Sequence, residues 1–486
     1  MIARRPNAAC EDTSMKPLPP MSVGTLLFLL AVLSCAGGVR AWYVATCAAN
    51  GQRNAAILVQ GPATPSHFPE EKTFRGRTPP TQLDNLVANM AEDRAFKCLT
   101  PLSDSEEFTG HEAPLYPLLF GMIAHWNDDW ADTILRWLQC VLGSLTATCY
   151  FCFARRAFHS TLIATLAGLL VACHPFWVIN TAELNDGVLA TFLVALSLAI
   201  GARAGQVGGA LTGLGFGLAL ASVGLTRAAL LPFAAVAVLW FLWECRRFPL
   251  GWFAGFLALV GFANGLAPWG IRDYLLFERP VPVATSTYLH LWMGNNPHAT
   301  GSTLDEAALR SSLPPDRLKE LLAESNQANR YNALAPDVWQ EVCAHPADTL
   351  ARRIQATLAF LLGDQWLKER QLGALLESND SVAELPAWLR DHAETILQGT
   401  LLGLLVLALL GWRWSYAWRR YGRIGVIAVL LIPLPYILSH AESLSGPRLP
   451  LDGVLLCYAA FALASLIPGL VGTPKSSSSD VQSPKA

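Results

Sequence analysis

The stretch Ala267-Pro268-Trp269-Gly270-Ile271-Arg272 turns a long apolar run into a polar string that ends in a positive charge. A second polar string, Leu291-Trp292-Met293-Gly294-Asn295-Asn296-Pro297, follows it. Before the first string, from about residue 113, the sequence alternates apolar runs with small loops. A helix needs roughly 20 apolar residues to cross ~30 Å of hydrocarbon. The pattern therefore predicts a membrane protein whose polar strings emerge at the membrane surface.

The composition supports this interpretation. The chain has 486 residues, of which 52% are hydrophobic and only 15% are charged. Soluble domains carry about a quarter charged residues, and the deficit here is concentrated in long apolar runs, as membrane insertion requires. The net charge of −2 leaves no basic face of the kind that binds nucleic acids. Composition predicts the lipid bilayer as a partner and excludes nucleic acid.

The apolar runs predict the fold class. Their approximate bounds are 21–46, 133–153, 161–180, 187–203, 208–225, 228–244, 250–270, 392–412, 424–440 and 451–471. We expect an all-α membrane protein, a polytopic bundle of about ten transmembrane helices within a membrane domain of residues 21–471. The first run stays partly apolar through Trp42 and Tyr43, which makes it longer than the core of most cleaved signal peptides.

The basic residues orient the bundle. With the N-terminus in the cytoplasm, every short inside loop is basic, as the positive-inside rule asks. The arginines concerned are Arg155, Arg156, Arg203, Arg246, Arg247, Arg413, Arg419, Arg420 and Arg423. The N-terminal segment 1–20 and a Ser-rich, disordered tail 472–486 are then cytoplasmic. We expect a multi-pass protein of a bacterial inner membrane, with both termini inside.

Two long polar segments, 47–113 and 272–390, are left on the non-cytoplasmic side. In the second, Leu309, Leu313, Leu318 and Leu321 recur at helical spacing, which predicts amphipathic helices lying on the membrane surface or on the bundle. Each segment also holds a cysteine, so the sequence leaves open whether Cys98 and Cys343 form a disulfide.

Charged residues gather at span ends on this same side. They are Glu112, Glu183, Asp186, Arg227, Arg272, His440 and Arg448. Snorkelling and helix capping explain any one of them, and Asp186 before Gly187 is well placed to open a helix. The whole set is harder to explain that way, because both signs of charge converge on one side of the membrane. We therefore treat these seven residues as candidates for substrate binding.

Such a set suits transfer of a group from a lipid phosphate. Arginines at span ends can neutralise the charge of a polyprenyl phosphate through forked hydrogen bonds. A carboxylate must take the proton of the attacking hydroxyl, and Asp84, Glu106 and Glu107 of the first outside segment are the candidates. The chain has no Gly-rich phosphate loop for a nucleotide.

Five segments carry a family resemblance. They are Asn89-Met90-Ala91-Glu92-Asp93-Arg94-Ala95-Phe96 with Ala113-Pro114-Leu115-Tyr116-Pro117-Leu118-Leu119, then Ala182-Glu183-Leu184, then Gly224-Leu225-Thr226-Arg227, then Pro268-Trp269-Gly270-Ile271-Arg272-Asp273-Tyr274 with Trp292-Met293-Gly294-Asn295-Asn296-Pro297, and Pro447-Arg448-Leu449-Pro450-Leu451-Asp452. On these residues the chain resembles the GT-C class of integral membrane glycosyltransferases. The closest type is the bacterial branch similar to protein O-mannosyltransferases and aminoarabinose transferases (glycosyltransferase 39-like). The segments span about residues 20–470, and the fourth is the most specific.

The resemblance implies catalysis on the non-cytoplasmic side with a polyprenyl-phosphate-linked sugar as donor. It also implies an essential acid shortly before the Asn89–Phe96 segment, near Pro79-Pro80-Thr81, where this sequence has none. Asp84, Glu106 or Glu107 takes that role, or the chain is inactive. Glu112 matches a family position near the donor phosphate, although the basic neighbour expected there is Ala113.

The leading hypothesis is a glycosyltransferase that moves a sugar from a polyprenyl phosphate to an acceptor on the non-cytoplasmic face. A transporter or flippase for a lipid-linked or anionic substrate is the first alternative, and a catalytically inactive relative of the same fold is the second. The sequence assigns no cofactor and no metal ligand, and it leaves open whether the protein uses a divalent cation. The sugar and its acceptor are not specified by the sequence.

Overall fold

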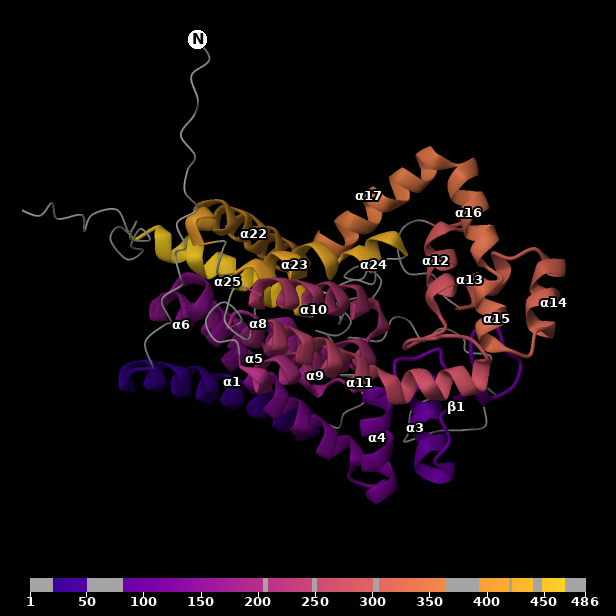
Figure 1. The fold of residues 1–486 in the computed structure, drawn as a ribbon, viewed down its shortest axis with the longest axis horizontal. Coiled ribbons are helices and arrows are strands. Elements are labelled where there is room, and N and C mark those ends of the chain that lie inside the picture. The colour runs from indigo at the N-terminus through magenta and orange to yellow at the C-terminus, as the bar shows by residue number, and fades with distance from the viewer. Residues whose placement is uncertain are drawn as a thin grey trace, which may run out of the picture.

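The computed structural model describes residues 21–49, 82–203, 209–246, 251–299, 306–362, 393–418, 422–439 and 448–467. These residues are helical apart from one short hairpin. Figure 1 shows two parts: a bundle whose helices run along the long axis of the molecule, and a group of shorter helices at one end of that axis.

The bundle is built from apolar helices of both halves of the chain. They are α1 (Val23–Ala49), α5 (Ala131–Phe158), α6 (Thr161–Ala172), α7 (Pro175–Ala182), α8 (Gly187–Gly201), α9 (Ala210–Thr226), η1 (Ala228–Leu230), α10 (Leu231–Cys245), α11 (Gly251–Phe277), α22 (Ala393–Trp414), η2 (Ser415–Trp418), α23 (Arg423–Leu431), α24 (Leu434–Leu438) and α25 (Leu449–Ser465). Helix α25 is buried along nearly its whole length, so the C-terminal part of the chain contributes to the centre of the bundle.

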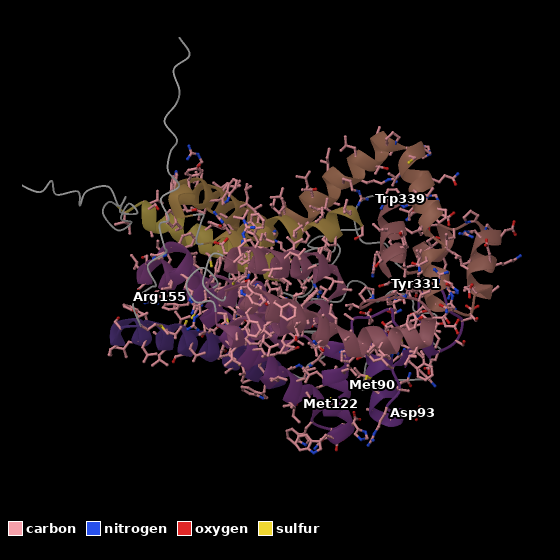
Figure 2. All side chains as sticks on the ribbon, viewed as in Figure 1. Met90, Asp93, Met122, Arg155, Tyr331 and Trp339 are labelled. Atoms are coloured by element: carbon pink, nitrogen blue, oxygen red, sulfur yellow. The ribbon has the colours of Figure 1, made fainter. Side chains whose placement is uncertain are left out.

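We call the described residues of 82–112 and 285–346 the end domain. It contains α3 (Gln82–Asp93), α12 (Thr287–Asn295), α13 (Glu306–Ser311), α14 (Pro315–Ala323), α15 (Gln327–Asn332), α16 (Ala335–Ala344) and the antiparallel strands β1 (Lys97–Cys98) and β2 (Glu107–Phe108). Helices α4 (Leu115–Trp126) and α17 (Pro346–Leu362) connect it to the bundle. In Figure 2, Asp93 and Tyr331 lie at this end of the molecule and Arg155 lies at the other.

Within the described residues, four helices are long and apolar enough to cross a membrane: Val23–Ala45 of α1, α5, Ala228–Cys245 and α11. The pair α6 and α7, bent by 47° at the break before Pro175, makes a possible fifth. Other predicted spans form apolar helices that are shorter than expected. Helix α8, for example, has 15 residues, which is about 22 Å at 1.5 Å per residue. The protein is a multi-pass helical membrane protein, and the count of ten spans stays a prediction.

The predicted start of the second outside segment, at residue 272, falls inside a helix. Helix α11 runs through Pro268 to Phe277, so the string that ends in Arg272 is the last part of a membrane-length helix and not a loop. A proline in a helix removes one backbone hydrogen bond. The side chains that follow it find partners outside the helix: Trp269 Nε1 donates to Val283 O at 2.9 Å.

The structure also bears on the helices, the helix start and the disulfide considered from the sequence. The helices expected around Leu309, Leu318 and Leu321 are α13 and α14, whereas Leu313 lies in the turn between them. Asp186 stands at the N-cap position of α8, but its side chain makes no capping hydrogen bond. A disulfide between Cys98 and Cys343 is wrong: both thiols are free, with Cys98 buried in the end domain and Cys343 exposed. The terminal segments 1–20 and 472–486 lie outside the described residues.

Helices α9 and α11 pack through glycines. A Cβ atom at Gly213 would lie 2.0 Å from Ala254 O, and one at Gly217 would lie 2.0 Å from Ala258 O. Small residues at such positions let helix backbones approach closely, which is how helices associate where lipid removes the hydrophobic driving force. Gly215, on the same helix, has no atom within 4 Å of its would-be Cβ.

We expect Gly217→Ala to lower stability by about 1–3 kcal/mol, because the new methyl group forces α9 and α11 apart. Gly215→Ala is the matched control and should leave the unfolding temperature unchanged or slightly raised. The measurement is thermal unfolding of the detergent-solubilised protein. Equal unfolding temperatures for the two variants would contradict the packing described.

Candidate functional site

A groove of about 520 Å³ lies where α11 meets the chain between α3 and β2. Its lining residues are Arg94, Ala95, Phe96, Phe108, Pro268, Ile271, Arg272, Leu275 and Leu276. Two guanidinium groups and two aromatic rings thus stand beside the apolar end of a helix that is long enough to cross a membrane.

Arg272 is held in the groove by several contacts. Its Nη1 donates to Asp273 Oδ1 at 2.6 Å and to Thr109 O at 2.8 Å. Its guanidinium carbon lies 4.4 Å from the centre of the Trp269 ring and 5.3 Å from that of Phe96, within the range of cation–π attraction. The Arg272 side chain keeps 23% of its surface exposed. The guanidinium is therefore oriented by the protein and still reachable from the groove.

Arg94 reaches the same groove from the end of α3. The helix ends at Asp93, and Arg94 has a positive φ of 55°, which turns the chain toward β1. The guanidinium lies 3.2 Å from His125 Nε2, and His125 Nδ1 lies 2.7 Å from Ala91 O. This contact chain connects the end of α4 to that of α3 and positions the second positive charge.

Residues 109–112 run past Arg272 between the bundle and the end domain. Thr285 N donates to Gly110 O at 2.7 Å, and Ser286 Oγ donates to His111 O at 2.9 Å. A Cβ at Gly110 would lie 2.9 Å from the Phe277 ring, so glycine allows the close approach to α11. The segment brings Glu112, a predicted binding residue, to this junction with a side chain that is 45% exposed.

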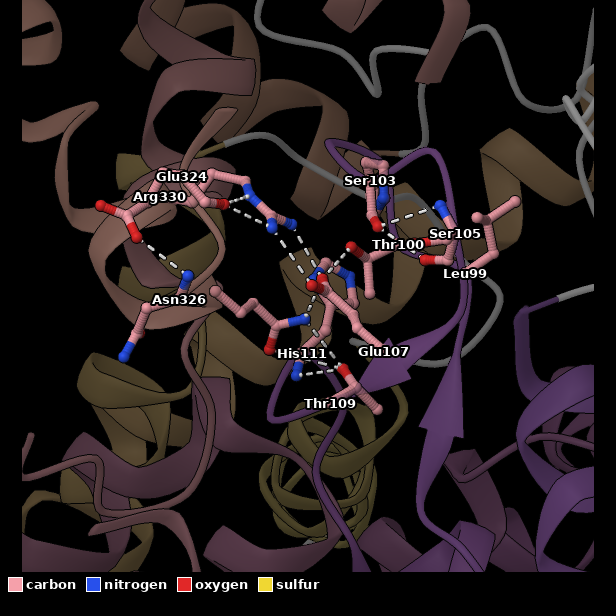
Figure 3. A network of polar contacts seen from close by, with 12 residues as sticks. Leu99, Thr100, Ser103, Ser105, Glu107, Thr109, His111, Glu324, Asn326 and Arg330 are labelled. Atoms are coloured by element: carbon pink, nitrogen blue, oxygen red, sulfur yellow. Dashed lines mark hydrogen bonds and ion pairs between the residues drawn. The ribbon is translucent and has the colours of Figure 1, made fainter. Parts of the chain in front are cut away.

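Glu107 lies at the centre of a polar network (Figure 3). Arg330 of α15 donates to both of its carboxylate oxygens, at 2.9 and 3.2 Å. Thr100 Oγ1 and Gln327 Nε2 donate to Oε1 at 2.8 and 3.0 Å. The Glu107 side chain is 17% exposed and that of Arg330 is 5% exposed. These contacts connect the hairpin to α15, and they engage the carboxylate that the sequence offered as a base.

The other two predicted bases lie nearby on α3 and β2. Asp84 is fully buried in the first turn of α3, where a negative charge is favoured by the helix dipole. Glu106 precedes β2, and its Oε2 accepts a hydrogen bond from Asn89 Nδ2 at 3.3 Å.

The predicted residues of the short loops form a separate group. Asp186 at the start of α8 and Arg227 after α9 make a bidentate ion pair, with Arg227 Nε 2.7 Å from Asp186 Oδ2. The structure thus brings together two charges that the sequence placed on one side. Glu183 is buried at the end of α7, and its backbone oxygen accepts a bond of 2.6 Å from Gln139 Nε2.

Arg448 is paired within its own helix. Its Nε donates to Asp452 Oδ1 at 2.7 Å, and Nη1 donates to Leu361 O of α17. Neither side chain has more than 2% of its surface exposed, so this pair is part of the interior of the bundle. His440 lies outside the described residues.

Sequence reasoning missed Arg94, Gln327 and Arg330. All three lie in polar surroundings, where charged and amide residues are common, so no local pattern marks them. Arg40 was also missed, although its signal was present: it is a positive charge inside the first apolar run. An ionisable residue in a span is a functional candidate by default.

Residues 111–267 match the sequence model of the family described as dolichyl-phosphate-mannose-protein mannosyltransferase. This part of the chain is similar to that family. The resemblance predicted from the sequence is therefore confirmed from the junction at His111 to the last turns of α11 before the groove. No curated protein matches the chain.

One solved structure with a similar shape is the archaeal oligosaccharyltransferase AglB from Archaeoglobus fulgidus, in complex with an inhibitory peptide and a dolichol-phosphate. The TM-score is 0.47 and the sequence identity 12%, with 92% of this chain and 51% of that chain covered. The chain thus spans about half of that protein, and a likeness this distant identifies neither a substrate nor site residues.

We expect Arg330→Met to destabilise the end domain by about 1–3 kcal/mol, because it leaves the partly buried Glu107 carboxylate without its guanidinium. Glu320→Gln is the control: it removes a carboxylate that is 69% exposed beside Arg317, a change within about 0.5 kcal/mol. Hydrogen exchange of β2 and α15 measures the effect. Unchanged protection in Arg330→Met would contradict the anchoring role of the pair.

The buried ring of His111 predicts a pH dependence. Burial lowers the pKa of His111 to about 3, and His290, whose ring centre lies 5.9 Å away, adds repulsion to the charged form. In the unfolded chain His111 is protonated near its ordinary pKa of about 6.5, whereas in the folded chain it stays neutral there. Stability should therefore fall as the pH drops from about 6.5 toward 3.

Unfolding temperatures measured across this pH range test the prediction. His111→Gln should reduce the acid-side loss, whereas the same substitution at the exposed His298 should leave it unchanged. An identical pH profile for wild type and His111→Gln would show that another group causes the loss.

Proposed function

We propose that the protein is a membrane glycosyltransferase that transfers a sugar from a polyprenyl phosphate to an acceptor on the non-cytoplasmic face. The family match over residues 111–267 supports the reaction class. The groove beside α11 is the observation that carries the proposal. The proposal includes the topology: a bundle of about ten spans within residues 21–471 of a bacterial inner-membrane protein. Segments 47–113 and 272–390 lie outside, and both termini lie in the cytoplasm.

The groove has an apolar surface and a positively charged one, which suit the isoprenoid chain and the phosphate group of a lipid phosphate. Ile271, Leu275 and Leu276 expose 59%, 74% and 39% of their surface on α11, so an isoprenoid chain lying along that helix meets apolar side chains. Arg94 and Arg272 line the same groove. Guanidinium groups bind phosphate through forked, charge-assisted hydrogen bonds. Contact with both surfaces would hold the phosphate at the end of α11 while its tail stays in the membrane.

The reaction then needs one bond made and one broken. The acceptor oxygen attacks the anomeric carbon, the bond from that carbon to the phosphate oxygen breaks, and the electron pair leaves with the polyprenyl phosphate. Arg272 and Arg94 stabilise the negative charge that develops on it. A carboxylate takes the acceptor proton.

Asp84 and Glu106 are the candidates that we propose for this carboxylate, and neither of them lines the groove. Glu107 accepts hydrogen bonds from Arg330, Thr100 and Gln327, and we give it a structural role. Glu106 stands just before β2, where it accepts a hydrogen bond from Asn89. Glu112, half exposed beside the groove, is proposed to contact the donor or the acceptor. The contributions of Glu183, Asp186, Arg227, His440 and Arg448 to substrate binding remain proposals.

Transfer from a polyprenyl-phosphate sugar in proteoliposomes tests the function. We expect Arg272→Gln to reduce transfer by about 100-fold or more, as loss of one donor to a developing anion does in other enzymes. Arg94→Gln should have a smaller effect, and one of the two variants Asp84→Asn and Glu106→Gln should abolish transfer. Arg413→Gln, at the end of α22, is the control and should transfer at the wild-type rate.

Arg272→Lys separates chemistry from folding, because it retains the charge and loses the fork. Wild-type rates in both Arg272 variants would remove the groove from the mechanism. Counter-flow uptake of the lipid-linked sugar without transfer would favour a transporter. Neither transfer nor uptake from a range of donors would favour the inactive relative.

A further inference from the structure

Arg40 is a positive charge in the interior of the bundle. It lies on α1, inside the membrane-length segment Val23–Ala45, and none of its surface is exposed. Gly143 of α5 makes room for it: a Cβ at that position would lie 2.6 Å from Arg40 Nε. A guanidinium buried among apolar helices needs compensation, because the low dielectric of the interior disfavours an isolated charge.

Part of that compensation comes from the broken span. Arg40 Nη1 donates to Ala172 O at 3.0 Å and to Ala36 O at 3.2 Å, and Nη2 donates to Val171 O at 3.4 Å. Helix α6 ends at Ala172, ahead of Pro175, so its last carbonyls have no partner within the helix. The guanidinium caps this negative end of the helix dipole.

The ion pairs of the described residues do not include Arg40. Arg448 and Asp452 form an ion pair in the bundle interior, and those two charges cancel each other. Arg40 Nε has no hydrogen-bond partner among the protein atoms, although it is buried. The helix end therefore satisfies two of the three guanidinium nitrogens and offsets only part of the charge.

A cavity of about 10 Å³ adjoins this guanidinium. It is lined by Arg40, Gly143, Thr146, Trp177, Asn180, Val188, Thr191 and Leu449. Trp177 Nε1 is buried and, like Arg40 Nε, has no protein partner. The hydroxyl groups of Thr146 and Thr191 donate to Leu142 O and Gly187 O of their own helices. The cavity has room for about one water-sized species, next to two unpartnered N–H donors and one positive charge.

We propose that this cavity is a structural anion site that binds a single halide ion, chloride under cellular conditions. A halide accepts hydrogen bonds from both N–H groups, as a water molecule does, and it also neutralises the guanidinium, which water cannot do. The gain is large in the low dielectric of the bundle. By pairing with Arg40, the ion connects α1 to α7 and holds the bend between α6 and α7. The site is separate from the groove at α11 and does not depend on the proposed transfer reaction.

The full-length protein in detergent tests this proposal through its thermal unfolding. With chloride replaced by gluconate at constant ionic strength, we expect a lower unfolding temperature. Chloride or bromide should restore it, and above the dissociation constant the unfolding temperature should rise with the logarithm of the halide concentration, because the ligand binds only the folded state. An unfolding temperature that does not depend on the halide would overturn the proposal.

Two variants and a control locate the effect. Arg40→Met should remove the halide dependence. Trp177→Phe keeps the charge and deletes one donor, so the halide concentration at which the unfolding temperature begins to rise should increase about tenfold. Trp137→Phe, on α5 with an exposed ring, should leave it unchanged. If Arg40→Met does not fold, Trp177→Phe still decides, and an unchanged titration curve in that variant overturns the site.

Anomalous scattering from a bromide-containing crystal identifies the occupant. A peak within hydrogen-bond distance of Arg40 Nε and Trp177 Nε1 supports the proposal. Electron density there without anomalous signal would identify a water molecule and overturn it.

Discussion

Every buried charge or backbone group in this bundle has to find its partner inside the protein, because neither lipid nor a packed interior supplies water. The break between α6 and α7 shows the consequence. There, Arg40 donates to the last carbonyl groups of α6. At the other end of α7, Arg136 Nε donates to Ala182 O and Gln139 Nε2 donates to Thr181 O. Side chains from neighbouring helices thus bond to carbonyl groups at the ends of both helices of the broken span.

The same constraint explains how the charges of the short loops are arranged. Asp186 and Arg227 neutralise each other across two loops, and Arg448 and Asp452 do so along one helix. Arg272 differs from these arginines because its guanidinium also stacks over Trp269 and lines an open groove. Arg272 therefore combines a positioned charge with access from the groove, next to apolar residues of α11. The two structural ion pairs lack this combination.

The end domain depends on one segment of chain. Residues 107–112 bond to α15 through Glu107, to α11 through Thr109 and to the chain before α12 through Gly110. These contacts join elements of the bundle and of the end domain. They therefore determine how the chain between α3 and β2 lies against α11, where the groove is formed. This is why a carboxylate that has the right residue type for a base, Glu107, is better explained as an anchor.

The sequence by itself determined the helical membrane class, the helices around Leu309 and Leu318 and the resemblance that the family match confirms over residues 111–267. These properties depend on local periodicity and on apolar length, which neighbouring residues specify. Only the tertiary structure decided that Glu107 pairs with Arg330, that α11 continues through Arg272 and that Arg94 faces the same groove. Those contacts join residues far apart in the chain, and their partners are selected by packing, on which residue type and spacing carry no information.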